Sequence, residues 1–243
     1  YNFSGCDTVL RNMMLSTYSN DGQAAKALQL CKKILDESLL LSDATVIHML
    51  QISGKTGSVS MCTETHNIIE SSSYEFGPHL ANTLAHAYGN CASMINAQSV
   101  FEKLVNPDIV SWNGLLAGYA HEGDYTASLR TLEEMELSGI TPDEYTFLSI
   151  LAACTHAGLV NMGIRIFEHM CNHYAIAPEI KHYICVIDLL GRAGDFKRAE
   201  DILQSMPTQA DVATWSCLVR ACRTHDNIDL EKHALDLAVC LQS

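Results

Sequence analysis

The sequence predicts an all-α fold, an α-solenoid that forms a right-handed superhelix of stacked helix-turn-helix hairpins. Three observations predict it: glycines recur about every 35 residues, small and large side chains recur in register with them, and apolar residues follow a helical period. A period of about 20 to 50 residues is typical of repeat proteins, whose units bury their apolar faces against their neighbours. We expect about fourteen helices in seven antiparallel pairs, and no sheet.

The glycine column divides the chain into units. Five glycines mark the same point in successive units: Gly22, Gly57, Gly123, Gly158 and Gly194. Their spacings are 35, 66, 35 and 36 residues, and Ala92 divides the longest into 35 and 31. After the end of a preceding repeat at 1–7, seven units tile the chain: 8–42, 43–77, 78–108, 109–143, 144–179, 180–211 and 212–243.

Two further columns keep the same frame. Five residues after the glycine position, the side chain is small in six of seven units, with Glu231 as the exception: Ala27, Cys62, Ala97, Ser128, Gly163 and Ala199. Four residues later, the side chains are mostly large and apolar: Cys31, His66, Phe101, Leu132, Phe167, Leu203 and Leu235. A small and then a large side chain on one helical face indicates close packing between helices.

The unit 109–143 illustrates how each hairpin is built. Its first predicted helix has one apolar face, formed by Trp112, Leu115, Leu116 and Tyr119. Its second has another, formed by Leu129, Leu132 and Met135. We expect Gly123 to end the first helix, because glycine adopts positive φ at least cost, and Gly139 with Pro142 to end the second. Trp112 and its counterpart Trp215 are predicted core residues.

Composition and charge exclude several classes of function. Hydrophobic residues make up 48% of the chain, and no apolar run approaches the roughly 20 residues of a membrane span, so we expect no membrane partner. The formal net charge of −13 argues against DNA binding, and weighs against any nucleic acid, because phosphate binding depends on clustered Lys and Arg. The ten cysteines include no C-x-x-C pair, and Cys62, Cys154 and Cys222 fall at predicted buried positions as packing thiols.

Motifs for metal binding or catalysis fit the sequence poorly. Cys154, His156, His169 and His173 have a metal-like spacing, but Cys154 lies on the buried face of its predicted hairpin. The sequence contains no H-x-E with C-x-x-C signature of a zinc deaminase, no nucleophile elbow and no glycine-rich phosphate loop. We therefore expect no catalytic residue, no metal, no cofactor and no enzyme activity.

Several stretches resemble a known repeat family. The segment 108–143, DIVSWNGLLAGYAHEGDYTASLRTLEEMELSGITPD, resembles a pentatricopeptide repeat (PPR), and the alternating unit lengths are similar to the P, L and S units of the PLS class of plant organelles. TFLSILAACTHAGLVNMGIRIFEHM (146–170) is similar to the final L unit and HYICVIDLLGRAGDFKRAEDILQSMP (182–207) to the final S unit. TWSCLVRACRTHDNIDLEKHALDLA (214–238) resembles the first E motif.

The resemblance assigns a type to each unit. By this resemblance, units 8–42 and 109–143 are P-type, 43–77 is L-type and 78–108 is S-type. Unit 144–179 is the final L-type repeat, 180–211 is the final S-type repeat, and 212–243 is a truncated first E motif. Proteins of this class are typically site-recognition factors for C-to-U RNA editing in mitochondria or plastids. No targeting segment is recognisable, so a mitochondrial or plastid location is what the resemblance implies.

The resemblance implies a sequence-specific module that binds single-stranded organelle RNA. A deaminase would then lie in a further C-terminal domain or in a partner protein, and editing cofactor proteins would dock on the L-type units. An alternative is a structural PPR scaffold that contacts protein in an organelle ribonucleoprotein complex. The acidic balance favours that alternative.

The family pattern also nominates base-reading residues. Helical-repeat RNA readers present two or three side chains per unit to one base. In the family, the fifth and last residues of a P or S unit face the base edge, which gives three pairs: Asn12 with Ser42, Asn82 with Asp108, and Asn113 with Asp143. Asn with Asp resembles a uridine reader and Asn with Ser a cytidine reader. The same residue types are also ordinary helix caps, and that reading stays open for Asn113 and Asp143.

Other positions are nominated for base faces and phosphates. The second residue of a unit packs against a base, which gives Val9, His79, Val110 and Tyr145. Lys55 and Arg192, near the ends of first helices, are predicted phosphate contacts. The L-type pairs Ile47 with Gly77 and Leu148 with Glu179 are expected to read no base, because an apolar fifth residue makes no base-edge hydrogen bond.

Overall fold

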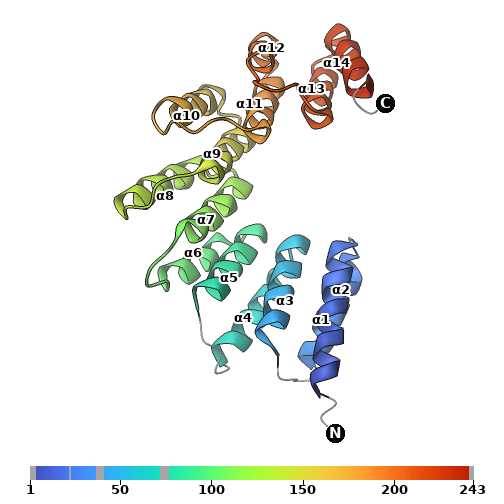
Figure 1. The fold of residues 1–243 in the computed structure, drawn as a ribbon, viewed down its shortest axis with the longest axis vertical. Coiled ribbons are helices and arrows are strands. Elements are labelled where there is room, and N and C mark those ends of the chain that lie inside the picture. Colours follow the sequence, from blue (N-terminus) through green and yellow to red (C-terminus); the bar gives the residue numbers. More distant parts are fainter. Residues whose placement is uncertain (1–3, 22, 37–40, 72–76, 241–243) are drawn as a thin grey trace. The chain divides into compact units, whose positions relative to one another are not determined.

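The computed structural model confirms the all-α class (Figure 1). It describes residues 4–21, 23–36, 41–71 and 77–240, which form fourteen helices and contain no strand. Gly22, the first member of the predicted glycine column, lies outside the described residues. Within the described part, no helix is long and apolar enough to cross a membrane.

The helices alternate as the first and second members of successive hairpins. The first helices are α1 (Ser4–Asn20), α3 (Asp43–Thr56), α5 (Pro78–Asn90), α7 (Ile109–Glu122), α9 (Glu144–Ala157), α11 (Ile180–Arg192) and α13 (Val212–Thr224). The second helices are α2 (Ala24–Asp36), α4 (Val59–Ser71), α6 (Met94–Glu102), α8 (Tyr125–Leu137), α10 (Val160–Asn172), α12 (Phe196–Gln204) and α14 (Ile228–Cys240). From α3 onward, each first helix begins at the first residue of a predicted unit, whereas α1 begins four residues before residue 8.

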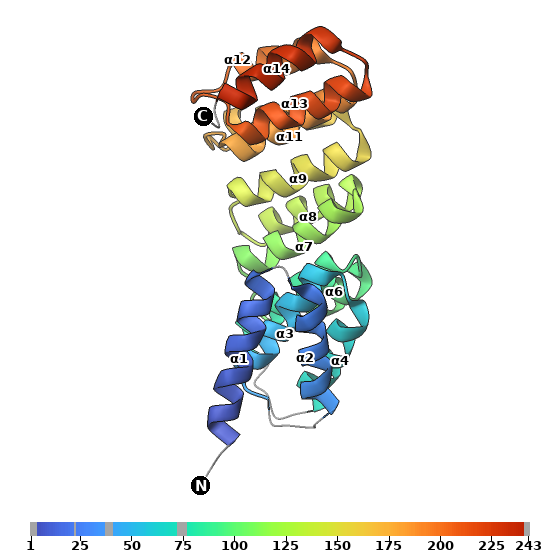
Figure 2. The same ribbon diagram turned by 90° about the vertical axis from the view of Figure 1, so that its right-hand side faces the viewer.

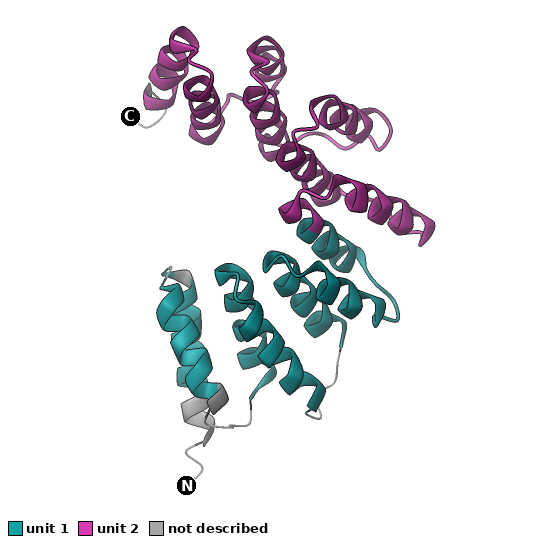
Figure 3. Ribbon diagram, turned by 180° about the vertical axis from the view of Figure 1, so that it is seen from behind, with its two compact units in different colours: residues 1–118 teal, residues 119–243 magenta. Residues whose placement is uncertain are grey.

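The chain divides into two compact units, 1–118 and 119–243, and the division falls within α7 (Figure 3). In the first unit, α3 packs between α1 and α5 (Figure 1), and in the second, α11 packs between α9 and α13 (Figure 2). Each unit therefore has a row of first helices. Six of the first helices also pack against the second helix of their own hairpin, in the pairs α1–α2, α3–α4, α5–α6, α9–α10, α11–α12 and α13–α14. This is the stacking predicted for a solenoid.

The predicted glycine column is the corner between the two helices of each hairpin. The four described glycines of the column have φ between 65° and 74°: Gly57, Gly123, Gly158 and Gly194. Ala92, which replaces glycine in one unit, adopts the same left-handed conformation with φ 53°, and so does Asp226 in the last unit with φ 55°. The corner geometry is therefore kept even where the residue is not glycine.

Small residues let neighbouring first helices approach closely. A Cβ atom built at Gly89 of α5 would lie 3.0 Å from the Cα atom of Gly118 in α7, and one at Gly191 of α11 would lie 2.6 Å from the Cβ atom of Ala221 in α13. A Cβ at Gly54 of α3 would lie 3.4 Å from the backbone of Ala87 in α5. In each case, the twelfth residue of one unit meets the tenth residue of the next.

The small-residue column is buried as predicted. Its apolar and hydroxyl members have no exposed surface: Ala27, Cys62, Ala97, Ser128 and Ala199. Gly163 is also buried, and a Cβ there would clash with Leu189 of α11. The exceptional Glu231 is half-buried, and its Oε1 atom accepts a hydrogen bond of 2.7 Å from the Nε atom of Arg223. Glu231 therefore replaces apolar packing with an ion pair.

The large-residue column is less uniform than predicted. Phe101, Leu132 and Phe167 are buried, but Leu235 is 42% exposed, so the prediction of a packing role is wrong for Leu235. Trp112 is buried with its ring centroid 4.6 Å from that of Phe101, whereas Trp215 is only half-buried and is not a core residue.

The three predicted packing thiols are fully buried. Cys62, Cys154 and Cys222 have no exposed surface. Burial raises the pKa of the Cys62 and Cys154 thiols to about 12, because a thiolate loses its hydration there, and it raises the pKa of Cys222 as well. These thiols stay protonated at neutral pH and act as apolar packing groups.

We predict that Ala92→Gly stabilises the protein. Glycine removes the steric cost of a left-handed residue but adds unfolded-state entropy, so the free energy of unfolding should rise by about 0.5–1 kcal/mol. Gly158→Ala is the matched control, because φ there is 68° and a Cβ meets no atom within 4 Å. It should lower the free energy of unfolding by a similar amount in the same urea titration. An Ala92→Gly protein that is less stable than the parent would contradict the assignment.

Candidate nucleic-acid interface

Two of the three predicted base-reading pairs come together where one first helix meets the start of the next. The fifth residue of a unit lies in the second turn of its first helix, and the last residue lies at the N-terminus of the following first helix. Ser42 is the N-cap of α3, and Asp143 is the N-cap of α9. Asp108 immediately precedes α7 and accepts a hydrogen bond from the backbone N–H of Ser111 at 2.9 Å. The last residue of a unit is therefore a helix cap by position.

Asn82 and Asp108 form a hydrogen-bonded pair. The Nδ2 atom of Asn82 donates to Oδ1 of Asp108 at 3.2 Å. The hydroxyl of Ser111, which is buried, lies 2.7 Å from Oδ1 of Asn82 and 2.8 Å from Oδ1 of Asp108, and can donate to either. Ser111 therefore fixes the orientation of the asparagine amide. The second N–H of Asn82 and the Oδ2 atom of Asp108 take part in none of these bonds.

These contacts tune the acidity of Asp108. Burial alone raises the pKa of this carboxyl group, but hydrogen bonds from the backbone and hydroxyl of Ser111 and from Asn82 outweigh it and hold the pKa below its ordinary value. The group is therefore ionised at neutral pH and only accepts hydrogen bonds.

Asn12 and Ser42 repeat the same arrangement. The Nδ2 atom of Asn12 donates to Oγ of Ser42 at 3.3 Å, and the hydroxyl of Thr45 donates to Oδ1 of Asn12 at 2.8 Å. Thr45 is buried, and its hydroxyl lies 2.8 Å from that of Ser42. Two of the three predicted pairs are therefore brought together, each by a buried hydroxyl three residues beyond the last residue of the unit.

Asn113 and Asp143 belong to different compact units, so each is described by itself. Asn113 lies half-buried on α7. The Oδ1 atom of Asp143 accepts hydrogen bonds from the backbone N–H groups of Tyr145 and Thr146 at 3.0 and 2.9 Å, and the backbone N–H of Asp143 donates to the hydroxyl of Thr146 at 3.1 Å. This is a capping box, so Asp143 does cap α9, and its base-reading role stays a prediction.

The third residue of a unit is a position that the sequence analysis missed. In five of the seven units this side chain is buried and hydrogen-bonded to the last residue of the preceding unit: Thr45, Ser111, Thr146, His182 and Thr214. The sequence does indicate this position, because a residue with a hydroxyl or imidazole group follows the capping residue by three positions. This spacing was not distinguishable from ordinary capping without the contact to the fifth residue.

The predicted stacking residues are exposed. Val9, His79, Val110 and Tyr145 all lie at the surface near the starts of their helices. The ring of Tyr145 is partly covered, because the Nζ atom of Lys181 lies 3.8 Å from its centroid. Lys181 also pairs with Glu179 at 3.1 Å. A base that stacks on this face of Tyr145 would first have to displace the Lys181 ammonium group.

The two side chains predicted to contact phosphates are exposed, and each already donates a hydrogen bond to another side chain. The Nζ atom of Lys55 donates to Oγ of Ser19 at 2.9 Å. The Nε atom of Arg192 donates to Oδ2 of Asp188 at 2.8 Å. Both side chains keep further N–H donors for a ligand.

The L-type units lack the polar pair. Ile47 and Leu148 are half-buried, and the paired Gly77 caps α5 without a side chain. Glu179 caps α11, and its backbone N–H donates to Nδ1 of His182 at 3.0 Å. That these units read no base stays a prediction.

The metal-like spacing forms no metal site. Cys154 is fully buried, while the rings of His169 and His173 stack on each other at 4.7 Å. Across the described ranges, no group of three or more His, Cys, Asp or Glu side chains is arranged to hold a metal ion.

Acidic residues concentrate on the second helices. The seven first helices contain six Lys or Arg and five Asp or Glu, whereas the seven second helices contain eight Lys or Arg and thirteen Asp or Glu. The first helices thus have a net charge of +1 and the second helices a net charge of −5, and the remaining −9 of the net charge lies outside the helices, in part at the N-caps of first helices.

Family comparisons agree with the repeat frame. The PPR repeat family model matches residues 107–156, and the PPR repeat model matches 145–173 and 182–209. Three Arabidopsis thaliana relatives are pentatricopeptide repeat-containing proteins, of which one is named ELI1, chloroplastic, and another is named mitochondrial. They are 34%, 37% and 30% identical over 92%, 88% and 91% of this chain. The chain spans only 25% to 34% of the length of these relatives.

Solved structures of the same architecture also match. The pentatricopeptide repeat protein PPR10 from maize superposes with a TM-score of 0.62 at 21% identity, over 95% of this chain and 34% of that one. PPR10 in complex with an 18-nt psaJ RNA element superposes with a TM-score of 0.57 at 18% identity, over 87% of this chain and 37% of that one. Because the identity to PPR10 is at most 21%, these two matches support the fold of the chain alone.

We predict that Ser111→Ala raises the pKa of Asp108 toward its ordinary value. Because the folded-state pKa of Asp108 is lowered, its contribution to stability is present above the unfolded pKa and is lost as the pH falls through the folded pKa. Removing the Ser111 hydroxyl should therefore raise the pKa of Asp108, so that the stability contributed by this carboxylate is lost at a higher pH. NMR titration of the carboxyl carbon of Asp108 measures this pKa. Asp211, whose pKa is lowered by the equivalent Thr214, is the internal control and should not move. An unchanged Asp108 titration would reject the assigned role of Ser111.

Proposed function

We propose a function for the chain that follows from these matches. They show pentatricopeptide repeats and homology to plant proteins that are named for this repeat. The function is sequence-specific binding of single-stranded RNA, in which each P-type or S-type unit reads one base. The observation that carries the proposal is the repeated cluster of a fifth-residue asparagine, a capping residue and a buried hydroxyl, beside an exposed second residue. The complex of PPR10 with RNA supports the same ligand class.

The chemistry of the Asn82–Asp108 pair suits uridine. The Watson–Crick edge of uracil offers one N–H donor between two carbonyl acceptors. The Oδ2 atom of Asp108 can accept from that donor, and the second N–H of Asn82 can donate to a carbonyl. Ser42 has a hydroxyl at the equivalent position, and its single proton faces Oγ1 of Thr45 because the Thr45 proton is donated to Asn12. If the hydroxyl rotates away from Thr45, it can donate to the N3 acceptor of cytosine, which agrees with a cytidine preference for the Asn12–Ser42 pair.

The biological role that we infer is site recognition for C-to-U editing of organelle transcripts. The PLS-like unit lengths and the similarity of 212–243 to a first E motif support this role. The chloroplastic and mitochondrial names of the relatives support an organelle location. Deamination would be supplied by a further domain or a partner protein, because the sequence has no zinc-deaminase signature.

The second candidate function is a scaffold that contacts protein. It is favoured by the net charge of −13 and by the apolar fifth residues Ile47 and Leu148. The asparagines that are held beside a capping residue in two units, Asn12 and Asn82, have no role in a scaffold, so we rank the scaffold second.

Binding measured at several salt concentrations separates the two functions. An RNA reader should bind single-stranded RNA with an affinity that falls as salt rises, with a logarithmic slope of about 0.7 for each phosphate contact. Duplex RNA of the same sequence is the control, because its base edges are not accessible. A chain that binds neither RNA, or both equally, would favour the scaffold.

We predict that Asp143→Asn moves base preference from uridine toward cytidine at one nucleotide. A carboxylate only accepts hydrogen bonds, whereas an amide also donates, and the change in discrimination should be roughly 1–3 kcal/mol. By the family rule, RNA runs 5′ to 3′ along the chain, so the affected nucleotide lies 3′ of the one read by Asn82 and Asp108. Competition among four RNAs that differ only there measures the preference.

Asp211→Asn is the matched control for this prediction. Asp211 caps α13 with the same contact to Thr214, but its unit has Ile184 at the fifth position. Asn caps a helix about as well as Asp, so neither substitution should change stability appreciably. An unchanged order of preference in Asp143→Asn would reject base reading by Asp143 and leave only its cap.

A further inference from the structure

We propose that Arg192 and Arg220 form a site for the phosphodiester backbone of single-stranded RNA on α11 and α13. The site rests on the proposed function and extends it to two units that have no asparagine at the fifth position. It adds Arg220, which no sequence pattern nominated, and it assigns Asp188 as the residue that positions both guanidinium groups.

One carboxylate holds both arginines. The Oδ1 atom of Asp188 accepts from Nη2 of Arg220 at 2.8 Å, and its Oδ2 atom accepts from Nε of Arg192 at 2.8 Å. The side chain of Asp188 is 14% exposed, whereas those of Arg192 and Arg220 are 54% and 66% exposed. The anion thus lies below the surface, and the two cations lie above it.

Asp188 stays ionised in this arrangement. Burial alone raises the pKa of its carboxyl group, but the hydrogen bonds from Arg220 and Cys217 and the charge of Arg192 outweigh burial and lower it. Burial and the neighbouring Asp188 charge raise the pKa of the Cys217 thiol to about 12, so Cys217 remains a neutral donor, 3.4 Å from Oδ1 of Asp188. The cluster therefore has two positive charges and one negative charge at neutral pH.

The close approach of α11 and α13 makes the cluster possible. Gly191 of α11 faces Ala221 of α13, and a Cβ on Gly191 would lie 2.6 Å from that of Ala221. Arg220 is adjacent to Ala221, and Asp188 lies one turn before Gly191, so a side chain from each helix can span the gap. Larger residues at the crossing would separate the helices and break the link between Arg220 and Asp188.

The cluster lies on the face that carries base readers in other units. Arg220 and Asp188 line a groove of about 450 Å³ together with Ile184 and Ser216, the fifth residues of units 180–211 and 212–243. Ala213, the second residue of the last unit, lines it as well. Ile184 makes no base-edge hydrogen bond, and the hydroxyl of Ser216 already donates to the backbone carbonyl of Val212. A strand that crosses this groove would therefore be held mainly by its backbone.

The ligand class follows from the donors that remain. Each guanidinium group has five N–H donors in a planar fork that matches two oxygens of a phosphate, and Asp188 engages only part of each fork. A carboxylate that holds both forks in advance reduces the entropy lost when a phosphate binds. The site would thus add one backbone contact without base preference.

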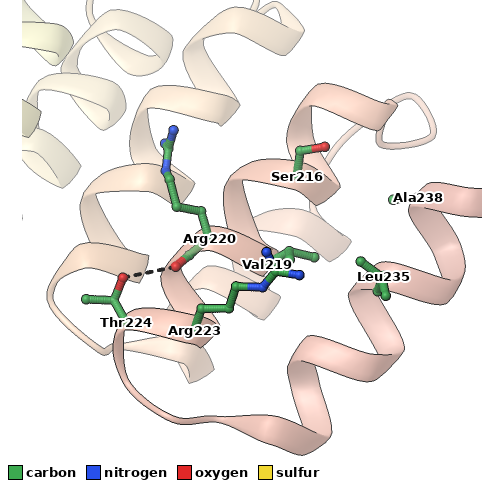
Figure 4. A pocket seen from close by; sticks show the side chains of 7 residues that line it. All are labelled: Ser216, Val219, Arg220, Arg223, Thr224, Leu235 and Ala238. Carbon is green, nitrogen blue, oxygen red and sulfur yellow. Dashed lines mark hydrogen bonds between the residues drawn. The ribbon is translucent and has the colours of Figure 1, made fainter.

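Arg223 provides a matched control on the same helix. Its Nε atom donates to Oε1 of Glu231 in α14 at 2.7 Å, and its side chain is 63% exposed. Figure 4 shows the Arg223 side chain directed toward Leu235 of α14, while the Arg220 side chain extends in a different direction. Removing either guanidinium changes the net charge equally, but only Arg220 belongs to the proposed site.

The test compares the parent chain, R220Q and R223Q in binding to a random-sequence single-stranded RNA of about 20 nucleotides over a range of KCl concentrations. R220Q should weaken binding roughly fourfold at about 0.15 M salt and lower the logarithmic salt slope by about 0.7, as expected for one lost phosphate contact to a single strand. Because the contact is to the backbone, oligouridine and oligoadenine should lose affinity by the same factor. R223Q should bind like the parent.

Two results would overturn the proposal while leaving the proposed function intact. In the first, the parent binds RNA with a salt-dependent affinity and R220Q binds identically. In the second, R220Q and R223Q lose the same affinity, which would reflect net charge alone. A parent chain without RNA affinity would instead overturn the proposed function and this site together. If R220Q loses helical circular dichroism, R192Q tests the site with the same expected losses, and unchanged binding of R192Q would overturn it.

Discussion

The close approach of successive first helices is the constraint on which the rest of the structure depends. Each hairpin has apolar faces that it cannot bury alone, so the hairpins must stack. The contacts of Gly54 with Ala87, Gly89 with Gly118 and Gly191 with Ala221 repeat one rule, in which the twelfth residue of a unit meets the tenth of the next. This spacing also sets how far the fifth residue of a helix lies from the cap of its neighbour, and hence whether the two can share a hydrogen bond.

A capping role and a recognition role are compatible in one residue. A carboxylate has two oxygens, and in Asp108 the hydrogen bonds to Ser111 and Asn82 all use Oδ1. The helix therefore occupies one side of the group, and Oδ2 remains for a ligand. Capping also removes the rotational freedom of the side chain, so a base would bind a carboxylate that is already ordered. The sequence analysis treated cap and base reader as competing interpretations of Asp143, but the geometry at Asp108 is compatible with both roles in one residue.

The sequence was sufficient for features that depend on local conformation and periodicity. The glycine column predicted the hairpin turns, including the one at Ala92, because few side chains are favourable in the left-handed backbone conformation. The small column predicted buried crossings, since one helical face repeats in every unit. Leu235 was predicted to pack and is exposed, because its column describes a helix and cannot say whether anything covers that face.

Side-chain contacts between hairpins could not be predicted from the sequence period. Arg220 and Asp188 are 32 residues apart and belong to different units, and neither repeats a column residue. Lys181 and Tyr145 share the second position of adjacent units, but only the structure brings the ammonium group over the ring. The third-residue hydroxyls were visible as a spacing from the cap, yet their bonds to Asn12 and Asn82 depend on how two helices pack.

The distribution of charge weakens the strongest objection to an RNA ligand. The net charge of −13 is not spread evenly, because the first helices have a net charge of +1, the second helices a net charge of −5, and the remaining −9 lies outside the helices. Carboxylates that remain near the first helices sit largely at N-caps, as Asp143 and Asp211 do, where the positive end of the helix dipole offsets part of their charge. Beyond about one Debye length, roughly 8 Å at physiological salt, an exposed charge is largely screened. A phosphate near Arg192 and Arg220 would therefore experience mainly the local cluster of two cations and the Asp188 carboxylate, whose net charge is +1, and the net charge of the chain would act chiefly on the rate of encounter.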